Sequence, residues 1–503
     1  ELTYTVIGSP LNGGMVTVAS DGGFVYRPMN AMAALGGTDT FTVLVSDEHA
    51  GLHVHGLFGL LKFVPIVGEL LYPGGGDRIE RTITVTMNLH NSITKDIKSE
   101  YTLGLRNANR GIDPRTMMLD VLFFAPPGGE QDFFAARKSL LGGPGLVWTT
   151  ENGGHWIGAC GEVVRSLWGD AERFSNEALA VTPGLGEVME FIPLQQDPPE
   201  HKPFRMAVMK GFANNHVVAM EPLVREQARL LIEGLMGKGG CEFMSQFAEI
   251  LPIHIFLTLI GVPPEDRAKL RPLGQQLTRP DGSMTVVELR DAADAYLEPY
   301  IRERLANPGS DLFSRILSVP IEGRAWTFDE AQRMCRNLLF GGLDTVVAMM
   351  GNMIMHLARH PDDQEYLRED ASRIPAAVDE LMRRYPTVSV TRNCVETTEV
   401  DGVEVREGDL IYLPSVLHNL DPACFDDPEK VDFDRGLSPV RHTTMGVGPH
   451  RCVGAGLARL EAIVVLEEWL AHMPHFSLAE DVQPTFRGGN VGSLLQLELR
   501  WAE

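Results

Sequence analysis

The chain has 503 residues, of which 44% are hydrophobic and 22% are charged. These proportions are ordinary for globular protein and exclude a chain that is disordered throughout. The 67 acidic residues outnumber the 44 basic residues and give a formal charge of −23. That excess argues against a nucleic-acid-binding surface, which would need clustered basic charge. At roughly 150 residues per domain, the length predicts two to four domains.

The cysteines and the apolar stretches bear on the cell compartment. Six cysteines are widely spaced and never form a Cys-x-x-Cys pair, which argues against a zinc module or a disulfide framework and favours a reducing compartment. No charged start followed by an apolar core and a cleavage site is visible, so we expect a cytoplasmic protein. The longest apolar stretch, residues 51–71, includes two histidines, a lysine, a proline and a glutamate. That composition is poor for a membrane span, and we expect an insert that packs on its own domain.

Residues 1–96 alternate polar and apolar side chains with a period of two, which predicts strands. The strands fall at residues 2–6, 14–18, 24–26, 39–45 and 81–86, and glycine-rich turns separate the early ones. The runs Asp-Gly-Gly-Phe-Val-Tyr-Arg-Pro (21–28) and Gly-Thr-Asp-Thr-Phe-Thr-Val (37–43) resemble the immunoglobulin-like or cadherin-like repeats of bacterial surface proteins. We therefore expect a small all-β sandwich, which serves as a spacer, a fusion element or a binding module.

A linker over residues 97–112 leads into a region, 113–503, whose pattern is mainly helical with a minor β component. Thr327 and Glu330 form a capping-box signal, and the apolar pattern after them continues to His360. This predicts one helix of roughly 50 Å, long enough to cross a domain. Val400-Asp-Gly-Val403 lies between alternating segments and predicts a tight hairpin.

Familiar nucleotide-binding and hydrolase motifs are absent from the sequence, and three other constellations remain. The first is Gly341-Gly-Leu-Asp-Thr345, inside the predicted long helix. Two glycines in mid-helix cost about 1 kcal/mol each relative to alanine, and close approach of a flat ligand to the backbone is one compensating reason. Asp344 and Thr345 place a carboxylate and a hydroxyl beside that opening, which suits proton relay. The alternative is a helix kink in which the threonine bonds back to the preceding turn.

The second constellation is Glu380-Leu-Met-Arg383. Glutamate and arginine three residues apart share one helix face and can pair. By itself this pattern is typical of a solvated surface pair.

The third constellation runs from Met445 to Gly456 and encloses Cys452 between glycines, just before a helical pattern. Backbone donors, the helix start and Arg451 would favour the thiolate form of the cysteine. A single thiolate suits an axial ligand to haem iron. A buried, inert cysteine in a glycine-rich loop is the alternative.

Taken together and in this order, the three constellations resemble the cytochrome P-450 family, and the resemblance extends from about Trp156 to the C-terminus. Within that family the chain most resembles the soluble bacterial camphor-hydroxylase branch. The matching runs include Phe191-Ile-Pro193, Asp197-Pro-Pro-Glu200, residues 278–285 and Gly341-Gly-Leu-Asp-Thr-Val-Val347. The resemblance implies a haem-thiolate monooxygenase, an oxidoreductase that inserts one oxygen atom of O2 into a C–H bond.

The resemblance also implies roles for particular residues. Cys452 would be the proximal ligand of the iron of haem b, and Glu380 with Arg383 a structural lock behind the haem. Thr345 and Asp344 would manage proton delivery during dioxygen activation, with Arg279 as a proton gate. The residues expected to hold the haem and its propionates, besides the cysteine, are Arg205, Arg392, His450, Gly446 and Gly454.

Departures from the branch bear on the substrate. Met189 stands where the camphor enzyme has a tyrosine hydroxyl, and Asn337 falls where that branch is usually apolar. We hypothesise that Asn337 supplies the polar anchor lost at Met189; the alternative is that Asn337 bonds within the helix bundle. The predicted substrate pocket comprises Met189, Phe191, Leu194, Leu277, Thr278, Asn337, Phe340, Gly341, Val388, Val390, Asn490 and Val491.

The implied substrate is a compact apolar molecule, such as a terpenoid or norisoprenoid. No electron-transfer motif is fused to the chain, so a two-iron two-sulfur ferredoxin and its NAD(P)H-dependent reductase are the implied partners, docking at Lys202, Arg205, Arg451 and Arg459. Two other functions remain open. One is a peroxide-driven enzyme on the same fold, against which the Asp344-Thr345 pair argues, and the other is a surface adhesion protein acting through residues 1–96.

Overall fold

The computed structural model describes residues 132–149, 152, 154–181, 185–278, 281–436, 441–480 and 482–502, together with six strands nearer the N-terminus. Two compact units are distinguished. One consists mainly of residues 1–95 and the other mainly of residues 96–503. The domain boundaries 1–96, 97–112 and 113–503 remain predictions.

The N-terminal unit contains five described strands at the positions that the alternation predicted: β1 (Leu2–Val6), β2 (Met15–Val18), β3 (Phe24–Arg27), β4 (Gly37–Asp47) and β5 (Arg78–Met87). The strand β4 pairs antiparallel with both β1 and β5, and β2 pairs antiparallel with β3. The sandwich, its immunoglobulin-like character and a role in adhesion remain predictions, because the side chains of these strands are not among those that the structure describes. The apolar stretch 51–71 lies outside them as well.

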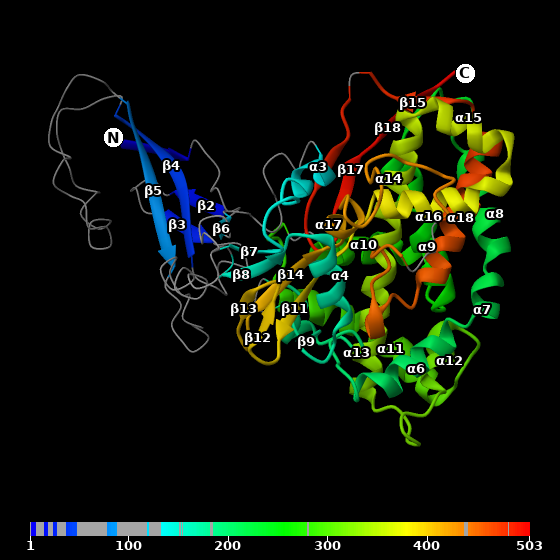
Figure 1. Ribbon diagram of the computed structural model, residues 1–503, viewed down its shortest axis with the longest axis horizontal. Coiled ribbons are helices and arrows are strands. Elements are labelled where there is room, and N and C mark those ends of the chain that lie inside the picture. The colour runs from blue at the N-terminus through cyan, green and yellow to red at the C-terminus, as the bar shows by residue number, and fades with distance from the viewer. Residues whose placement is uncertain are drawn as a thin grey trace. The chain divides into compact units, whose positions relative to one another are not determined.

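The second unit is mainly helical, as predicted (Figure 1). Its described α-helices are α3 (Phe133–Lys138), α4 (Gly161–Gly169), α5 (Leu185–Met189), α6 (His201–Gly211), α7 (Asn214–Val218), α8 (Glu221–Glu233), α9 (Leu251–Leu259), α10 (Arg267–Thr278), α11 (Val286–Ala306), α12 (Leu312–Leu317), α13 (Phe328–Leu343), α14 (Thr345–Arg359), α15 (Pro361–Glu369), α16 (Ile374–Arg384), α17 (Ser415–Asn419) and α18 (Ala455–His472).

A six-stranded sheet lies to one side of the helices (Figure 1). Its order is β6 (Met118–Leu119), β7 (Leu146–Thr149), β8 (His155–Gly158), β14 (Leu410–Pro414), β11 (Ser389–Cys394) and β9 (Phe174–Ser175). A second sheet joins β10 (Gly240–Glu242), β18 (Glu498–Trp501) and β15 (Phe476–Leu478), and a ribbon joins β16 (Thr485–Arg487) to β17 (Ser493–Gln496). The predicted hairpin is present: β12 (Thr398–Val400) pairs with β13 (Val403–Val405) across a turn at Asp401 and Gly402, both with positive φ.

The helix α14 forms the centre of the core. Every residue from Val347 to Ala358 is buried, including four methionines and two alanines. The segment Phe328–Arg359 is apolar and long enough to cross a membrane by composition, but 78% of its most apolar window is buried inside the protein. A helix buried on all sides needs an apolar surface all round, so this composition is explained by the core.

Candidate active site

A cavity of about 380 Å³ lies where α6, the junction of α13 and α14, β11 and the start of α18 meet. Its wall is formed by segments between residues 168 and 491. The cavity is therefore a product of the tertiary fold and not of one local stretch of sequence. The predicted residues that line it are Leu194, Arg205, Asn337, Gly341, Thr345, Val388, Val390, Arg392, Gly446, His450, Cys452, Gly454, Asn490 and Val491.

The loop before α18 presents Cys452 to this cavity. Gly446 and Gly448 adopt positive φ values of 77° and 67°, a conformation that glycine adopts without steric cost. The Cys452 amide donates to the Met445 carbonyl at 2.7 Å, which closes the loop behind the sulfur. Gly454 then caps α18. The glycines therefore allow the tight turn that points the thiol into the cavity, as the sequence predicted.

The surroundings of the Cys452 thiol act in opposite directions on its charge. Burial raises the pKa of the thiol, whereas the backbone N–H groups of Gly454 and Ala455 and the positive charges of Arg205 and Arg451 lower it. Burial is the largest of these effects, which corrects the expectation that the loop alone favours thiolate. A bound cation would supply the missing stabilisation, because a metal deprotonates a coordinating thiol.

Two arginines and two histidines gather on the cavity wall near Cys452. Arg392 is almost fully buried and donates to the carbonyls of Thr391 (2.9 Å) and Trp168 (3.1 Å), and burial lowers its pKa to about 10. Arg205 on α6 donates to the Arg451 carbonyl. Remaining guanidinium hydrogens of both arginines are available to an anion in the cavity, because each guanidinium carries five donors.

The rings of His201 and His450 lie 4.3 Å apart, and the Nε2 atom of each is buried without a hydrogen-bond partner. Burial lowers the pKa of His450 to about 3 and that of His201 to about 4. Sequence analysis missed His201 as a site residue. The signal was present, because His201 and Arg205 stand four residues apart and therefore share one face of α6.

The predicted long helix is interrupted at Asp344, whose φ of −134° lies outside the helical range, so α13 ends at Leu343 and α14 begins at Thr345. The Thr345 hydroxyl donates to the Gly341 carbonyl at 3.0 Å and lines the cavity. The kink and the opening predicted as alternatives therefore occur together. Asp344 is buried outside the cavity wall, and Arg279 lies outside the described residues.

The two glycines at this junction differ in what surrounds them. A Cβ at Gly341 would meet nothing within 4 Å, whereas a Cβ at Gly342 would overlap the ring of Phe256 on α9. Close ligand approach therefore accounts for Gly341 only. Gly342 is required by helix packing.

The Glu380–Arg383 pair is buried, with side-chain exposures of 1% and 0%. This excludes the solvated surface pair that the motif alone suggested and leaves the structural role that the resemblance implied. Arg383 makes two 2.8 Å bonds to the Glu380 carboxylate and donates to three backbone carbonyls, those of Asn419, Pro428 and Lys430. The pair ties α16 to the segment that precedes the cysteine loop. The spacing alone could not show this, because surface pairs have the same spacing.

Five predicted pocket residues, namely Met189, Phe191, Leu277, Thr278 and Phe340, do not line the cavity. Met189 is fully buried, and the rings of Phe191 and Phe340 pack edge to face at 6.0 Å in a layer behind the wall. The Thr278 hydroxyl donates to the Gly274 carbonyl at 3.1 Å within α10. The prediction that these five residues line the pocket is therefore wrong.

Asn337 lines the cavity and also bonds within the bundle, since its Nδ2 donates to the Ile192 carbonyl at 3.1 Å. The alternative, a hydrogen bond within the protein, is therefore present, and the role of Asn337 as polar anchor stays a prediction. Wall residues that sequence analysis missed include Val208, Phe212, Phe256, Met349 and Glu461. Burial raises the pKa of the Glu461 carboxyl well above its usual range.

The residues around the cavity fit a haem. A thiol lines the cavity, and open space lies beside Gly341 for a flat ring. The Nε2 atoms of His201 and His450, which lack hydrogen-bond partners, line the cavity together with two arginines. Buried polar atoms normally have partners, and carboxylates such as the haem propionates would supply them.

Comparisons with known proteins agree with this fit. The family model described as Cytochrome P450 matches residues 283–498. "Probable cytochrome P450 127A1" of Sinorhizobium fredii is 33% identical over 355 residues, which are 70% of this chain and 85% of the relative. The crystal structure of cytochrome P450 CYP101C1 is 65% identical with a TM-score of 0.74 and covers 78% of this chain and 98% of its own. The corresponding values for CYP101J2 are 36%, 0.71, 77% and 98%.

The chain belongs to the cytochrome P450 family. It is a monooxygenase that binds haem iron through a cysteine thiolate. When bound, the haem activates dioxygen for insertion into a C–H bond, and the thiolate ligand favours O–O cleavage.

Proposed function

We propose that this enzyme hydroxylates a compact apolar small molecule, of the terpenoid or norisoprenoid kind, with O2 and electrons from a two-iron two-sulfur ferredoxin and its NAD(P)H-dependent reductase. The observation that carries the proposal is the convergence of Cys452, Arg205, Arg392, His450 and Thr345 on one cavity. The similarity to two CYP101 structures supports the camphor-hydroxylase branch inferred from sequence motifs.

We infer that Cys452 is the iron ligand, because its side chain lines the cavity and Cys424 is not part of the wall. Arg205, Arg392 and His450 would hold the haem propionates through charge-assisted hydrogen bonds, and His201 would join them. Arg205 donates to the carbonyl of Arg451, the residue next to the cysteine, so haem binding and the cysteine loop are coupled.

The cavity supports an apolar substrate through the side chains of its lining. Its wall is mostly apolar on the side formed by Leu194, Val388, Val390 and Val491. In such a pocket the apolar side chains contribute most of the contact with the ligand, and the few polar groups fix the orientation of the ligand.

Asn337 is the proposed orienting group. One amide hydrogen is committed to the Ile192 carbonyl, which leaves the other hydrogen and Oδ1 for a substrate oxygen. Asn337→Leu is expected to bind an oxygenated substrate at least tenfold more weakly and to spread the product among several positions, about 1.4 kcal/mol of lost interaction. Unchanged affinity and regioselectivity would contradict the assignment.

Thr345 and Asp344 are proposed to deliver protons, with the Thr345 hydroxyl at the cavity and the Asp344 carboxylate behind it. Thr345→Ala is expected to keep consuming NAD(P)H and O2 while forming less product and more hydrogen peroxide. The peroxide-driven alternative predicts that wild type turns over with peroxide as fast as with ferredoxin. Comparing the two turnover rates on one substrate separates the proposals.

Two of the four residues predicted to dock the ferredoxin are engaged within the protein. Arg459 forms a bidentate pair with Asp379 at 2.8 and 2.9 Å, and Arg205 lines the cavity, so neither is free for a partner. We propose instead the exposed side of α6, where Lys202 and Lys210 flank Met206 and Met209, two large apolar side chains that are 52% and 54% exposed. An acidic ferredoxin complements this surface in charge.

Charge reversal at Lys202 and Lys210 tests the docking surface, with Lys269→Glu as a matched control on α10, where the lysine is 71% exposed. The double reversal is expected to slow reduction by ferredoxin about tenfold at low salt, with the difference shrinking as salt rises. The control should reduce at the wild-type rate. An unchanged rate and salt dependence in the double variant would contradict the docking proposal.

A ligand screen followed by the haem spin-state shift tests the substrate class. Terpenoids and norisoprenoids should shift the spin state and be hydroxylated, whereas long-chain fatty acids and large macrolides should not. A response to the larger molecules alone would refute the compact-substrate proposal.

A further inference from the structure

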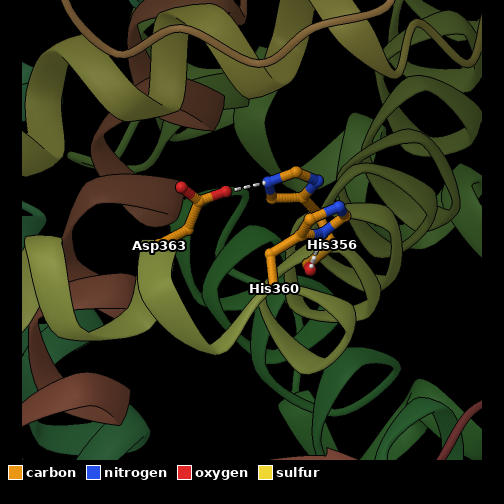
Figure 2. Close-up of side chains that lie close together, drawn as sticks. All are labelled: His356, His360 and Asp363. Atoms are coloured by element: carbon orange, nitrogen blue, oxygen red, sulfur yellow. Dashed lines mark hydrogen bonds and ion pairs between the residues drawn. The ribbon is translucent and has the colours of Figure 1, made fainter.

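A second cluster of metal-binding residue types lies outside the cavity, where α14 gives way to α15 (Figure 2). His356 lies in the last turn of α14, and His360 is the residue between α14 and α15. Asp363 follows two residues after Pro361, which begins α15. Ligand atoms from the three side chains all lie within 4.8 Å of one another. None of the three residues is part of the cavity wall.

Hydrogen bonds orient both imidazoles. His360 Nδ1 lies 2.8 Å from the His356 carbonyl oxygen, and because a carbonyl can only accept, Nδ1 carries the proton and Nε2 has a free lone pair. His356 Nδ1 lies 2.8 Å from the Tyr385 hydroxyl, which can accept or donate. The tautomer with a free Nε2 is therefore accessible to His356 too.

His356 Nε2 faces the Asp363 carboxylate at 2.7 Å, and the two imidazole rings stack at 4.1 Å with an angle of 20° between them (Figure 2). Because near-parallel rings have near-parallel lone pairs, the exposed His360 ring must turn before its Nε2 can reach an ion held by His356 Nε2 and Asp363. Both Nδ1 atoms are already hydrogen-bonded. Metal-binding histidines generally have the other ring nitrogen hydrogen-bonded in this way, because the bond fixes the tautomer and the ring orientation.

We propose that His356 Nε2, His360 Nε2 and an Asp363 carboxylate oxygen form a binding site for a divalent transition metal of the zinc class, with water as the remaining ligand. Zinc takes nitrogen and carboxylate ligands at about 2.0–2.2 Å, so the cluster must contract around the ion. Asp363 is 30% exposed and His360 is exposed, which leaves both free to move, whereas His356 is held in the core.

Metal binding replaces the hydrogen bond between His356 and Asp363, and the proton of the neutral His356 ring moves from Nε2 to Nδ1, which then donates to the Tyr385 hydroxyl. Protons compete with the ion for the histidine nitrogens, so the affinity for the metal falls as the pH is lowered. The bound ion would join the end of α14 to the start of α15. Through the Tyr385 hydroxyl it would also touch the C-terminal end of α16, the helix of the Glu380–Arg383 pair. The bound ion would therefore connect three helices, α14, α15 and α16, at a place outside the cavity.

Equilibrium dialysis of the full-length holoenzyme against zinc chloride, followed by elemental analysis, tests the site. Haem iron provides the internal standard for protein concentration. The variants are His360→Gln and Asp363→Asn. The matched control is His475→Gln, because His475 is a 62% exposed histidine that faces Glu365 at 3.3 Å and has no third ligand nearby among the described residues.

The ratio of zinc to haem iron should be higher by one in wild type and His475→Gln than in His360→Gln and Asp363→Asn. Zinc should raise the melting temperature of wild type and His475→Gln only. Calcium should not compete for the site, because nitrogen ligands disfavour it. Equal zinc content in all four proteins, or loss of zinc in His475→Gln alone, would overturn the proposal. Displacement of zinc by calcium would overturn the assigned ligand set.

Discussion

Arg383→Met removes one partner of a buried ion pair whose two side chains are at most 1% exposed. Breaking such a pair costs about 3–5 kcal/mol because the other charge stays buried. Glu380 keeps two contacts in the variant, a 3.1 Å bond from Arg435 and a 3.0 Å bond from the Asp432 amide. We therefore expect a loss near the lower limit, about 3 kcal/mol, with the backbone carbonyls that Arg383 bonds as a further contribution.

The loss is a large share of the roughly 5–15 kcal/mol by which a folded domain is stable. The assay is urea unfolding of the holoenzyme, followed by Soret absorbance and tryptophan fluorescence. The matched control is Arg373→Met, which removes a 32% exposed arginine paired with an exposed Glu369 at 3.4 Å and should cost less than about 1 kcal/mol. If both variants shift the urea midpoint equally, the reasoning from burial is refuted.

Two further predictions concern packing and pH. Gly341→Ala should leave the unfolding midpoint unchanged or raise it, because alanine stabilises a helix by about 1 kcal/mol relative to glycine and the added methyl group meets open space. The same methyl group should narrow the cavity and weaken substrate binding. Gly342→Ala should lower stability by about 1–3 kcal/mol through overlap with Phe256; equal midpoints for the two variants would contradict this distinction. His442 is buried with both ring nitrogens unpartnered, and burial lowers its pKa to about 3. Since the unfolded chain takes up this proton near pH 6.5 and the folded chain does not, stability falls as the pH drops from 6.5 toward 3, by about 2 kcal/mol at pH 5. His442→Leu should reduce the slope of that part of the stability profile measured by urea unfolding, because one of the buried histidines that cause it is removed. An unchanged slope would contradict the assignment.

The chemistry of the site was largely predictable because it is concentrated in short motifs. The glycine-rich loop around Cys452 and the Asp344-Thr345 pair each carry their chemistry within a dozen residues, and the structure brings Cys452 and Thr345 to one cavity. The mainly helical fold was predictable from periodicity for the same reason, since the helical repeat is local.

What could not be predicted depends on contacts between distant segments. No local pattern shows that the Phe256 ring occupies the space next to Gly342, or that Met189 is not part of the cavity wall. The prediction of one unbroken helix up to His360 was wrong, because the apolar pattern continues one helical repeat through Asp344; only the kink alternative at this motif indicated the break. The burial of Arg383 depends on carbonyls contributed by residues 419–430, and spacing within one helix carries no information about them.

The central claim is that Cys452 is the thiolate ligand of the haem iron. The ferrous–CO difference spectrum of Cys452→Ser, compared with wild type and with Cys424→Ser, tests it most directly. Cys424 is a fair control because burial raises the pKa of its thiol to about 11 and its side chain is not part of the cavity wall. Wild type and Cys424→Ser should show the thiolate-type Soret band, and Cys452→Ser should lack it. A thiolate-type band that survives in Cys452→Ser, or disappears in Cys424→Ser, would contradict the account.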